Sequence, residues 1–109
     1  MAIKTLTKAI FDAQVLETQG TVLVEFSAPW CGYCRRIAPA MQTLSDSLAG
    51  KVTVGAVDID EEPELTERYE VETIPALLLF KAGSLTGEPL IAPESRGRIE
   101  AWLKENGAI

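Results

Sequence analysis

The sequence predicts an α/β fold in which a mixed central sheet of about five strands is flanked by four helices. Two observations support this prediction. Short apolar, β-branched runs alternate with amphipathic segments over most of the chain, an order typical of parallel strands joined by helices. A turn at residues 81–84 then joins two strand-like runs directly, which forces an antiparallel pair late in the sheet.

The first predicted elements are a short edge strand over residues 2–5 and a helix from Thr7 to about Glu17. Thr7 is a residue type that caps helices, and Gly20 follows as a helix terminator. Three residues are expected to give this helix its apolar contacts: Leu6, Ile10 and Phe11.

A buried strand and a long helix are predicted next. Residues 21–26 are β-branched and almost continuously apolar, as expected for a strand that is covered on both faces. The helix follows a turn at Pro29-Trp30 and ends at Gly50, and Pro39 inside it is expected to cause a kink. One face of this helix carries apolar residues at spacings of four, three and four: Ile37, Met41, Leu44 and Leu48.

Residues 52–57 are predicted to form a second buried strand. Pro63 is a favourable first residue for the short helix that follows, from which Leu65 and Tyr69 face inward. The acidic run over residues 58–64 is then a solvated loop and helix start, with its charges near the positive end of the helix.

The last predicted elements complete the sheet and cover it. Residues 76–80 form a third core strand, residues 89–92 an edge strand, and Ser95 caps a final helix. That helix carries an apolar stripe: Ile99, Trp102 and Leu103. The predicted order is β-α-β-α-β-α-β-β-α, within a single domain of residues 1–109.

The composition excludes several kinds of function. The 109 residues have a net charge of −6, no histidine and two cysteines. Histidine-based triads are therefore excluded, and two cysteines are too few for a structural zinc site, so we expect no metal. There is no basic face for nucleic acid, and the longest apolar run, residues 76–80, is too short to span a membrane. The first residues lack the apolar segment of a secretory signal, which predicts a cytoplasmic protein.

Both cysteines lie in Trp30-Cys31-Gly32-Tyr33-Cys34, between a predicted buried strand and the start of a helix. Unpaired backbone N–H groups at a helix N-terminus favour a thiolate at Cys31. Cys34 lies one turn further along the same face, within disulfide reach and more buried. The pair can therefore exchange with a substrate disulfide through a mixed disulfide. A structural disulfide is the alternative, but so small a loop would stabilise the chain little.

Glu25 is the second unusual residue, because a lone carboxylate in a strand covered on both faces is costly. A desolvated carboxyl group has a raised pKa and can take the proton of Cys34, through water. The alternative is that Glu25 reaches solvent or pairs with a lysine or arginine.

Three residues around the cysteines carry further expectations. Trp30 is expected to be half exposed, with substrate contact and simple packing as alternatives, and Tyr33 is expected to be exposed. Pro75 comes directly before the third core strand. Spacing alone predicts a trans turn proline there, because the cis form is the minority state.

Five segments, in this order and spacing, resemble the thioredoxin family: Val24–Cys34, Ile37–Pro39, Val57–Asp60, Thr73–Pro75 and Phe80–Gly83. The resemblance implies the thioredoxin fold, with Cys31 as the nucleophile, Cys34 as the resolving thiol and Pro75 in the cis form. In relatives the backbone beside that proline pairs with an extended substrate chain. We therefore expect six substrate-binding residues: Trp30, Gly32, Tyr33, Thr73, Ile74 and Pro75.

Several positions depart from the family pattern. Thioredoxins proper carry Pro where this chain has Tyr33, and usually Asp where it has Glu25. The other departures are Ser27 for an aromatic residue, Ala56 for a lysine, Ala76 for threonine, and no glycine at Ile91-Ala92. Because Val24–Cys34 also resembles protein disulfide isomerase domains, we expect a redox poise between the two groups.

The leading interpretation is a cytoplasmic, monomeric thiol–disulfide reductase that serves electron transport and cell redox homeostasis. The resemblance implies protein disulfides as substrates and a flavin-dependent thioredoxin reductase as electron donor. No cofactor is expected beyond the Cys31–Cys34 disulfide. Two alternatives stay open, namely an oxidase or isomerase of an oxidising compartment and a binding module in which the dithiol is idle.

Overall fold

The computed structural model describes residues 3–109, and a mixed sheet with the strand order β1-β3-β2-β4-β5 lies at its centre. The strands are β1 (Lys4–Thr5), β2 (Thr21–Ser27), β3 (Val52–Asp58), β4 (Ala76–Lys81) and β5 (Ser84–Ile91). β1, β3 and β2 run parallel, whereas β4 is antiparallel to both of its neighbours. The predicted mixed sheet is confirmed. The predicted first strand is confirmed over Lys4–Thr5 only, because Ile3 is not part of it and Ala2 lies outside the described residues.

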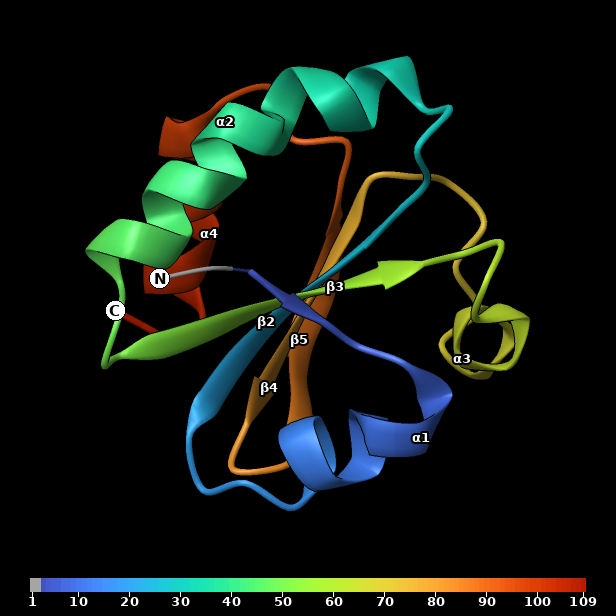
Figure 1. The fold of residues 1–109 in the computed structure, drawn as a ribbon. Helices are drawn as coiled ribbons and strands as arrows, with labels where there is room; N and C mark the ends of the chain where they lie inside the picture. Colours follow the sequence, from blue (N-terminus) through green and yellow to red (C-terminus); the bar gives the residue numbers. More distant parts are fainter. Residues whose placement is uncertain (1–2) are drawn as a thin grey trace.

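In the described part of the chain four α-helices flank the sheet, as predicted (Figure 1). They are α1 (Lys8–Phe11), α2 (Gly32–Ser47), α3 (Pro63–Arg68) and α4 (Arg96–Glu105). α2 and α4 cover one face of the sheet, while α1 and α3 lie on the other. α2 contains Pro39 and bends along its length, which agrees with the predicted kink. No helix within residues 3–109 is long and apolar enough to cross a membrane.

The prediction of one continuous α-helix from Thr7 to Glu17 is wrong in its second half. α1 passes directly into a π-helix, η1 (Asp12–Leu16), and the Glu17 amide donates to the Asp12 carbonyl at 2.9 Å, a spacing of five residues. Thr7 holds the N-cap position with an extended backbone, but its side chain makes no capping hydrogen bond. Ile10, expected among the apolar contacts, is 40% exposed, whereas Leu6 and Phe11 are buried.

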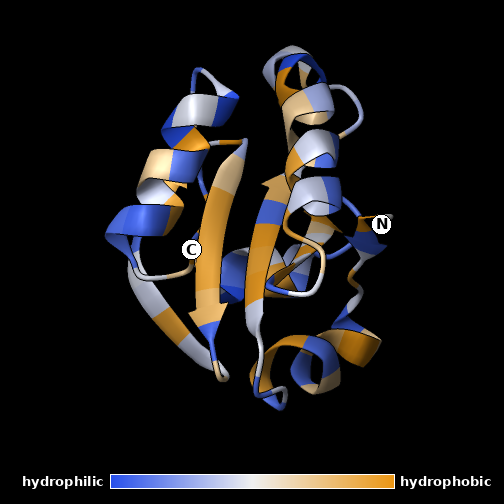
Figure 2. Cartoon of the chain, turned by 90° about the vertical axis from the view of Figure 1, so that its left-hand side faces the viewer, coloured by the Kyte–Doolittle hydropathy of each residue, from blue (hydrophilic) through white to orange (hydrophobic). Residues whose placement is uncertain are grey.

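The two faces of the sheet have different cores. The face under α1 and α3 holds a cluster of aromatic rings, in which Phe11 and Phe80 lie 5.9 Å apart and Tyr69 and Phe80 lie 5.5 Å apart. The face under α2 and α4 is mainly aliphatic, and the predicted core residue Trp102 is buried within it. Figure 2 shows the strands as hydrophobic bands between helices whose outer sides are hydrophilic.

The last hairpin is longer than predicted. Ala82 and Gly83 both have positive φ, 49° and 82°, which is the geometry of a tight two-residue turn. Pairing therefore begins at once, with Lys81 opposite Ser84, and the edge strand starts five residues before the predicted one. The predicted cap of the last helix is confirmed, because the Ser95 hydroxyl accepts from the Arg98 amide at 3.1 Å.

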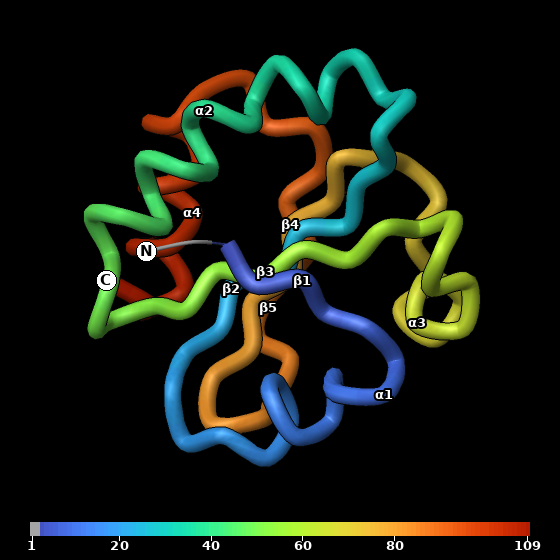
Figure 3. The backbone as a smooth tube through the Cα atoms, in the orientation of Figure 1, coloured from blue at the N-terminus to red at the C-terminus, as the bar shows by residue number. Residues whose placement is uncertain are grey.

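The connections at one end of the sheet come together at the start of α2. Figure 3 shows the link from β2 to α2 passing the segment that leads into β4. The contacts agree with this view, because Ile59 after β3 and Ile74 before β4 both pack against the cluster of Ala28, Cys31 and Cys34. The fold thus gathers three connections around the cysteines.

Candidate active site

The cysteine pair begins α2, directly after the buried strand β2. Cys31 is the N-cap residue, and its Sγ accepts a hydrogen bond from the Cys34 amide at 3.1 Å. The two Cα atoms are 5.2 Å apart and the side chains form a disulfide, so the predicted disulfide reach is confirmed. Cys34 is 5% exposed and Cys31 8% exposed, which is the predicted order with a small margin. A sulfur at this position faces unpaired amides of the first helical turn.

The Ile74–Pro75 peptide bond beside the cysteines is cis. The resemblance to relatives implied this form correctly, and the trans proline expected from spacing is wrong. Pro75 is buried, and its carbonyl accepts from the Ala92 amide at 2.8 Å. Ile74 packs against the cysteine cluster, and Thr73 is exposed just before it. The chain around Pro75 therefore lies next to the disulfide.

Trp30 is a surface residue that is held in place. Its side chain is 63% exposed, so the packing alternative does not describe it. The indole Nε1–H donates to Asp60 Oδ2 at 2.6 Å. Asp60 is itself positioned, because its amide donates to Asp58 Oδ1 at 2.9 Å. The sequence placed Asp60 in a solvated acidic run, and the Asp-Ile-Asp pattern after the strand was the only signal for its role as an acceptor.

Tyr33 was predicted to be exposed, and this prediction is wrong, because the residue is partly buried. Its hydroxyl donates to the Pro93 carbonyl at 3.1 Å, and the Arg36 guanidinium lies 5.5 Å from its ring centroid. The first turn of α2 directs the ring toward the connection between β5 and α4, which supplies the acceptor. Gly32, between the cysteines, is exposed, and no heavy atom lies within 4 Å of the point where a Cβ would stand.

Glu25 lies on β2 directly opposite Ala56 of β3 and Leu77 of β4. It is 7% exposed, and burial raises its pKa to about 7. Within residues 3–109 no hydrogen bond or ion pair reaches its carboxyl group, so the lysine or arginine partner is wrong. The other half of that alternative, contact with solvent, agrees with the structure, because the unpartnered carboxyl oxygens are not fully buried.

The Glu25 side chain borders a pocket of ≈ 280 Å³ that Cys34, Arg35 and Asp58 also line. The carboxyl group and the second cysteine thus share one space that is open to water. Ala56, where the family resemblance led us to expect a lysine, leaves Glu25 without a cation directly opposite it on β3.

Ala92 marks another departure from the family pattern. Its φ is 46°, in the left-handed region that favours glycine. This is the place where the sequence lacks the expected glycine. The strained residue is the donor to Pro75, so the strain lies at the edge of the site. Within the part of the chain that the structure describes, no group of three or more His, Cys, Asp or Glu residues could hold a metal ion.

Comparisons with known proteins agree with this geometry. A protein-family model described as thioredoxin matches residues 2–105. The chain is 39% identical to a thioredoxin of Alicyclobacillus acidocaldarius over 104 residues, which cover 95% of this chain and 97% of that protein. It is 42% identical to a thioredoxin of Rhodospirillum rubrum over 83 residues, 76% of this chain and 80% of that protein.

Similarity extends to a larger protein. Over 83 residues the chain is 42% identical to a putative protein disulfide-isomerase of Dictyostelium discoideum. The matched part is 76% of this chain but 20% of that protein, so the chain corresponds to one segment of it.

Proposed function

The chain belongs to the thioredoxin family, and from that premise we propose that it reduces protein disulfides through the Cys31–Cys34 dithiol. The observation that carries this proposal is the disulfide at the N-terminus of α2, next to the cis bond before Pro75. Family membership and this cysteine pair support thiol–disulfide oxidoreductase activity. The direction of electron flow and the residue roles that follow are part of the proposal.

Cys31 is the nucleophile in this mechanism. Its sulfur already accepts the Cys34 amide, and the same donor stabilises a thiolate in the reduced protein. The thiolate attacks one sulfur of the substrate disulfide. A bond forms between Cys31 and that sulfur, and the other substrate sulfur leaves as a thiolate.

Cys34 completes the exchange. Its thiol loses a proton, the resulting thiolate attacks Cys31 Sγ, and the second substrate sulfur leaves. Two electrons have then moved to the substrate, and Cys31 and Cys34 are joined as the disulfide. Glu25 accepts the proton through water in the pocket that both side chains line. A carboxyl group with a pKa of about 7 is suited to accept and return a proton near neutral pH.

The surface around the disulfide binds the substrate chain. Trp30 and Gly32 are exposed next to Cys31 in the chain, and Ile74, between exposed Thr73 and buried Pro75, packs against the cysteine cluster. An extended substrate segment pairs with the backbone before Pro75, in the manner of an added strand. Tyr33, turned toward Pro93, closes the side of this surface near β5 and α4.

Each turnover leaves the protein oxidised, so a donor of two electrons must restore the dithiol. We assign this role to a flavin-dependent thioredoxin reductase, with the protein acting as a cytoplasmic monomer in electron transport. No cofactor is needed, because the disulfide itself carries the electrons. The similarity to a putative disulfide-isomerase favours a second candidate, oxidation or isomerisation of disulfides in an oxidising compartment.

A trapping experiment tests the proposal. Cys34→Ser removes the resolving thiol, so reaction with an oxidised protein should stop at a mixed disulfide that is visible on a non-reducing gel. Cys31→Ser is the matched control and should form no such adduct. Adducts that form equally well through Cys34 would contradict the assignment of Cys31 as the nucleophile.

A further inference from the structure

β5 carries two residues more than a regular ladder with β4 would need. Leu79 lies opposite Thr86, whereas Leu77, two residues earlier in β4, lies opposite Leu90, four residues later in β5. Residues 87–89 therefore form a bulge between these two pairs. A bulge bends its strand and changes which residues are paired beyond it.

This bulge decides which residue of β5 meets the cis proline. Beyond the bulge Ala76 lies opposite Ile91, and the Ala92 amide donates to the Pro75 carbonyl at 2.8 Å. Without the two extra residues, a regular antiparallel ladder would place Pro89 opposite Ala76, and a different residue would lie beside the cis proline. The donor at this edge of the site is therefore set by the bulge.

The bulge is attached to α4. The indole Nε1–H of Trp102 donates to the Glu88 carbonyl at 3.0 Å. Trp102 is buried in the aliphatic cluster together with Leu90, which follows the bulge directly. Gly87 has a φ of 68°, and a Cβ at this position would overlap the side-chain oxygen of Asn106 at the end of α4. The bulge therefore meets α4 at two points, and one of them is a hydrogen bond.

The end of α4 is itself held against the sheet. The Asn106 side-chain amide donates to the Trp102 carbonyl at 2.9 Å. Lys81, the last residue of β4, donates from Nζ to the carbonyls of Asn106 and Gly107, both at 3.3 Å. These bonds hold α4, and with it the indole of Trp102, in a fixed position relative to the β4–β5 hairpin.

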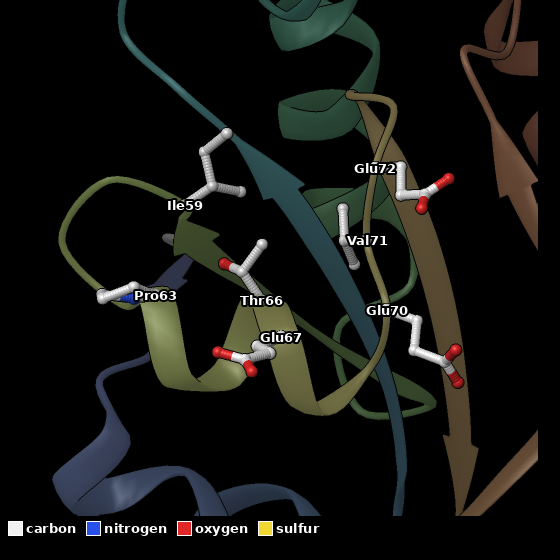
Figure 4. A pocket seen from close by; sticks show the side chains of 7 residues that line it. All are labelled: Ile59, Pro63, Thr66, Glu67, Glu70, Val71 and Glu72. Carbon is white, nitrogen blue, oxygen red and sulfur yellow. The ribbon is translucent and has the colours of Figure 1, made fainter.

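The segment that leads to Pro75 is fixed separately at its far end. In Figure 4 the side chain of Glu72 points away from α3, on the opposite side of the segment from Val71. The Val71 amide donates to the Thr66 carbonyl at 3.0 Å, and its side chain packs on the aromatic cluster. This end of the segment therefore follows α3, whereas the end at Pro75 follows Ala92 of β5.

We propose that Trp102 is a positioning residue for substrate binding, which acts through the bulge of β5 on the hydrogen bond between Ala92 and Pro75. The inference rests on the proposed reduction of protein disulfides, in which the substrate chain pairs with the backbone before Pro75. Trp102 belongs to the aliphatic cluster and not to the cysteine cluster. Its acceptor, Glu88, precedes Ala92 by four residues, so a shift of the bulge reaches the site along one short strand.

Trp102→Phe removes the indole donor and keeps an aromatic ring in the core. The Glu88 carbonyl then loses its partner, and the bulge is no longer held by α4. KM for a protein disulfide should rise by about fivefold, equivalent to about 1 kcal/mol, the usual contribution of one hydrogen bond. The redox potential and the rate with a small disulfide that has no peptide chain should stay unchanged, because neither sulfur loses a contact.

Val52→Ala is the matched control for lost stability. Val52 is buried in the same aliphatic cluster as Trp102, but it begins β3, and the cysteines lie near the other end of that strand. This variant should lower Tm as Trp102→Phe does, and it should leave KM unchanged. An equal rise of KM in both variants would reflect general loosening and would overturn the proposal.

The variant Ala92→Gly tests the route from Trp102 to the site. Two substitutions that act on the same contact are not additive. Trp102→Phe should therefore raise KM by much less in the Ala92→Gly background than in the unaltered protein. Full additivity of the two effects would show that Trp102 does not act through Ala92.

Amide hydrogen exchange separates this inference from the proposed function, because exchange does not require activity. In Trp102→Phe the Ala92 amide should exchange faster relative to the Leu79 amide in the middle of β4, and Val52→Ala should leave this ratio unchanged. An unchanged ratio in Trp102→Phe would overturn the positioning role even if the protein reduces disulfides. Absence of Cys31-dependent reduction in the unaltered protein would instead overturn the proposed function.

Discussion

The two faces of the sheet differ in the side chains that β2 buries on them. Under α1 and α3 every inward residue of β2 is apolar: Val22, Val24 and Phe26. On the face under α2 and α4, β2 presents Leu23 and then Glu25, a buried acid directly beneath the helix that begins at the cysteines. On the first face β2 buries only apolar side chains. On the second face the buried carboxyl group of Glu25 lowers the stability of the protein next to the dithiol. The proton-accepting role proposed for Glu25 would account for an acid at this position.

The largest expected effect on stability comes from the aromatic face. Phe80→Ala removes a ring that is 1% exposed and packs against Phe11 and Tyr69. Truncating a buried phenylalanine lowers the free energy of unfolding by about 3–5 kcal/mol. Urea denaturation measures this loss, and the redox potential of the dithiol should stay unchanged. A shifted potential would show that the two faces are not independent.

Glu25→Gln should stabilise the protein, and the size of this stabilisation should depend on pH. Below pH 4.5, the ordinary pKa, Glu25 is protonated in both the folded and the unfolded states, and its burial is least costly. Between pH 4.5 and about 7 only the unfolded state ionises, so the protein loses stability as the pH rises. The variant should therefore gain about 3 kcal/mol over the parent above pH 7, and little below pH 4.5.

The same variant tests the role of Glu25 in the reaction. If Glu25 accepts the proton of Cys34, its removal should slow the release of the mixed disulfide and abolish a rate inflection near pH 7. Rapid mixing with an oxidised peptide across the pH range separates this step from the first attack. An unchanged pH profile would leave Glu25 as a destabilising residue with no catalytic purpose.

A smaller effect is expected at Tyr33. Tyr33→Phe keeps the ring near Arg36 but removes the hydrogen bond to the Pro93 carbonyl. A hydrogen bond of this kind contributes about 1 kcal/mol, which thermal denaturation can resolve. Loss of stability without any change in KM for a protein substrate would show that this contact braces the fold and does not shape the binding surface.

The smallest effect is the relief of strain at Ala92. The left-handed conformation costs a non-glycine residue such as Ala92 about 1–2 kcal/mol of conformational energy. Glycine avoids this cost, but it loses more backbone entropy on folding, so Ala92→Gly should raise the free energy of unfolding by about 0.5–1 kcal/mol. Ala82→Gly, in the hairpin turn away from the cysteines, is the matched control with a φ of 49°. Both should stabilise the protein, but the first alone should raise KM, because Ala92 holds the Pro75 carbonyl.

The sequence predicted the elements whose signals are local. The strand over residues 21–26 and the helix with Ile37, Met41 and Leu44 carry the periods of their structures, and the cysteine spacing sets the disulfide. The π-helix after Phe11 escaped prediction, because its hydrogen bonds span five residues while the apolar pattern stays helical.

Contacts between distant residues could not be predicted from local patterns. Trp30 and Asp60 are 30 positions apart and Tyr33 and Pro93 are 60 apart, so only the assembled fold brings each pair together. The form of the bond before Pro75 is similar, because spacing supports the trans form and only resemblance to relatives indicated the cis form.

The redox potential of the Cys31–Cys34 couple tests the central claim most directly, by equilibration with glutathione and a reference dithiol. Reference potentials are about −270 mV for thioredoxin and about −180 mV for protein disulfide isomerase. A reductase with Tyr33 between its cysteines should give a reversible two-electron couple between these values. A potential more oxidising than about −180 mV, or the absence of a reversible couple, would contradict the account.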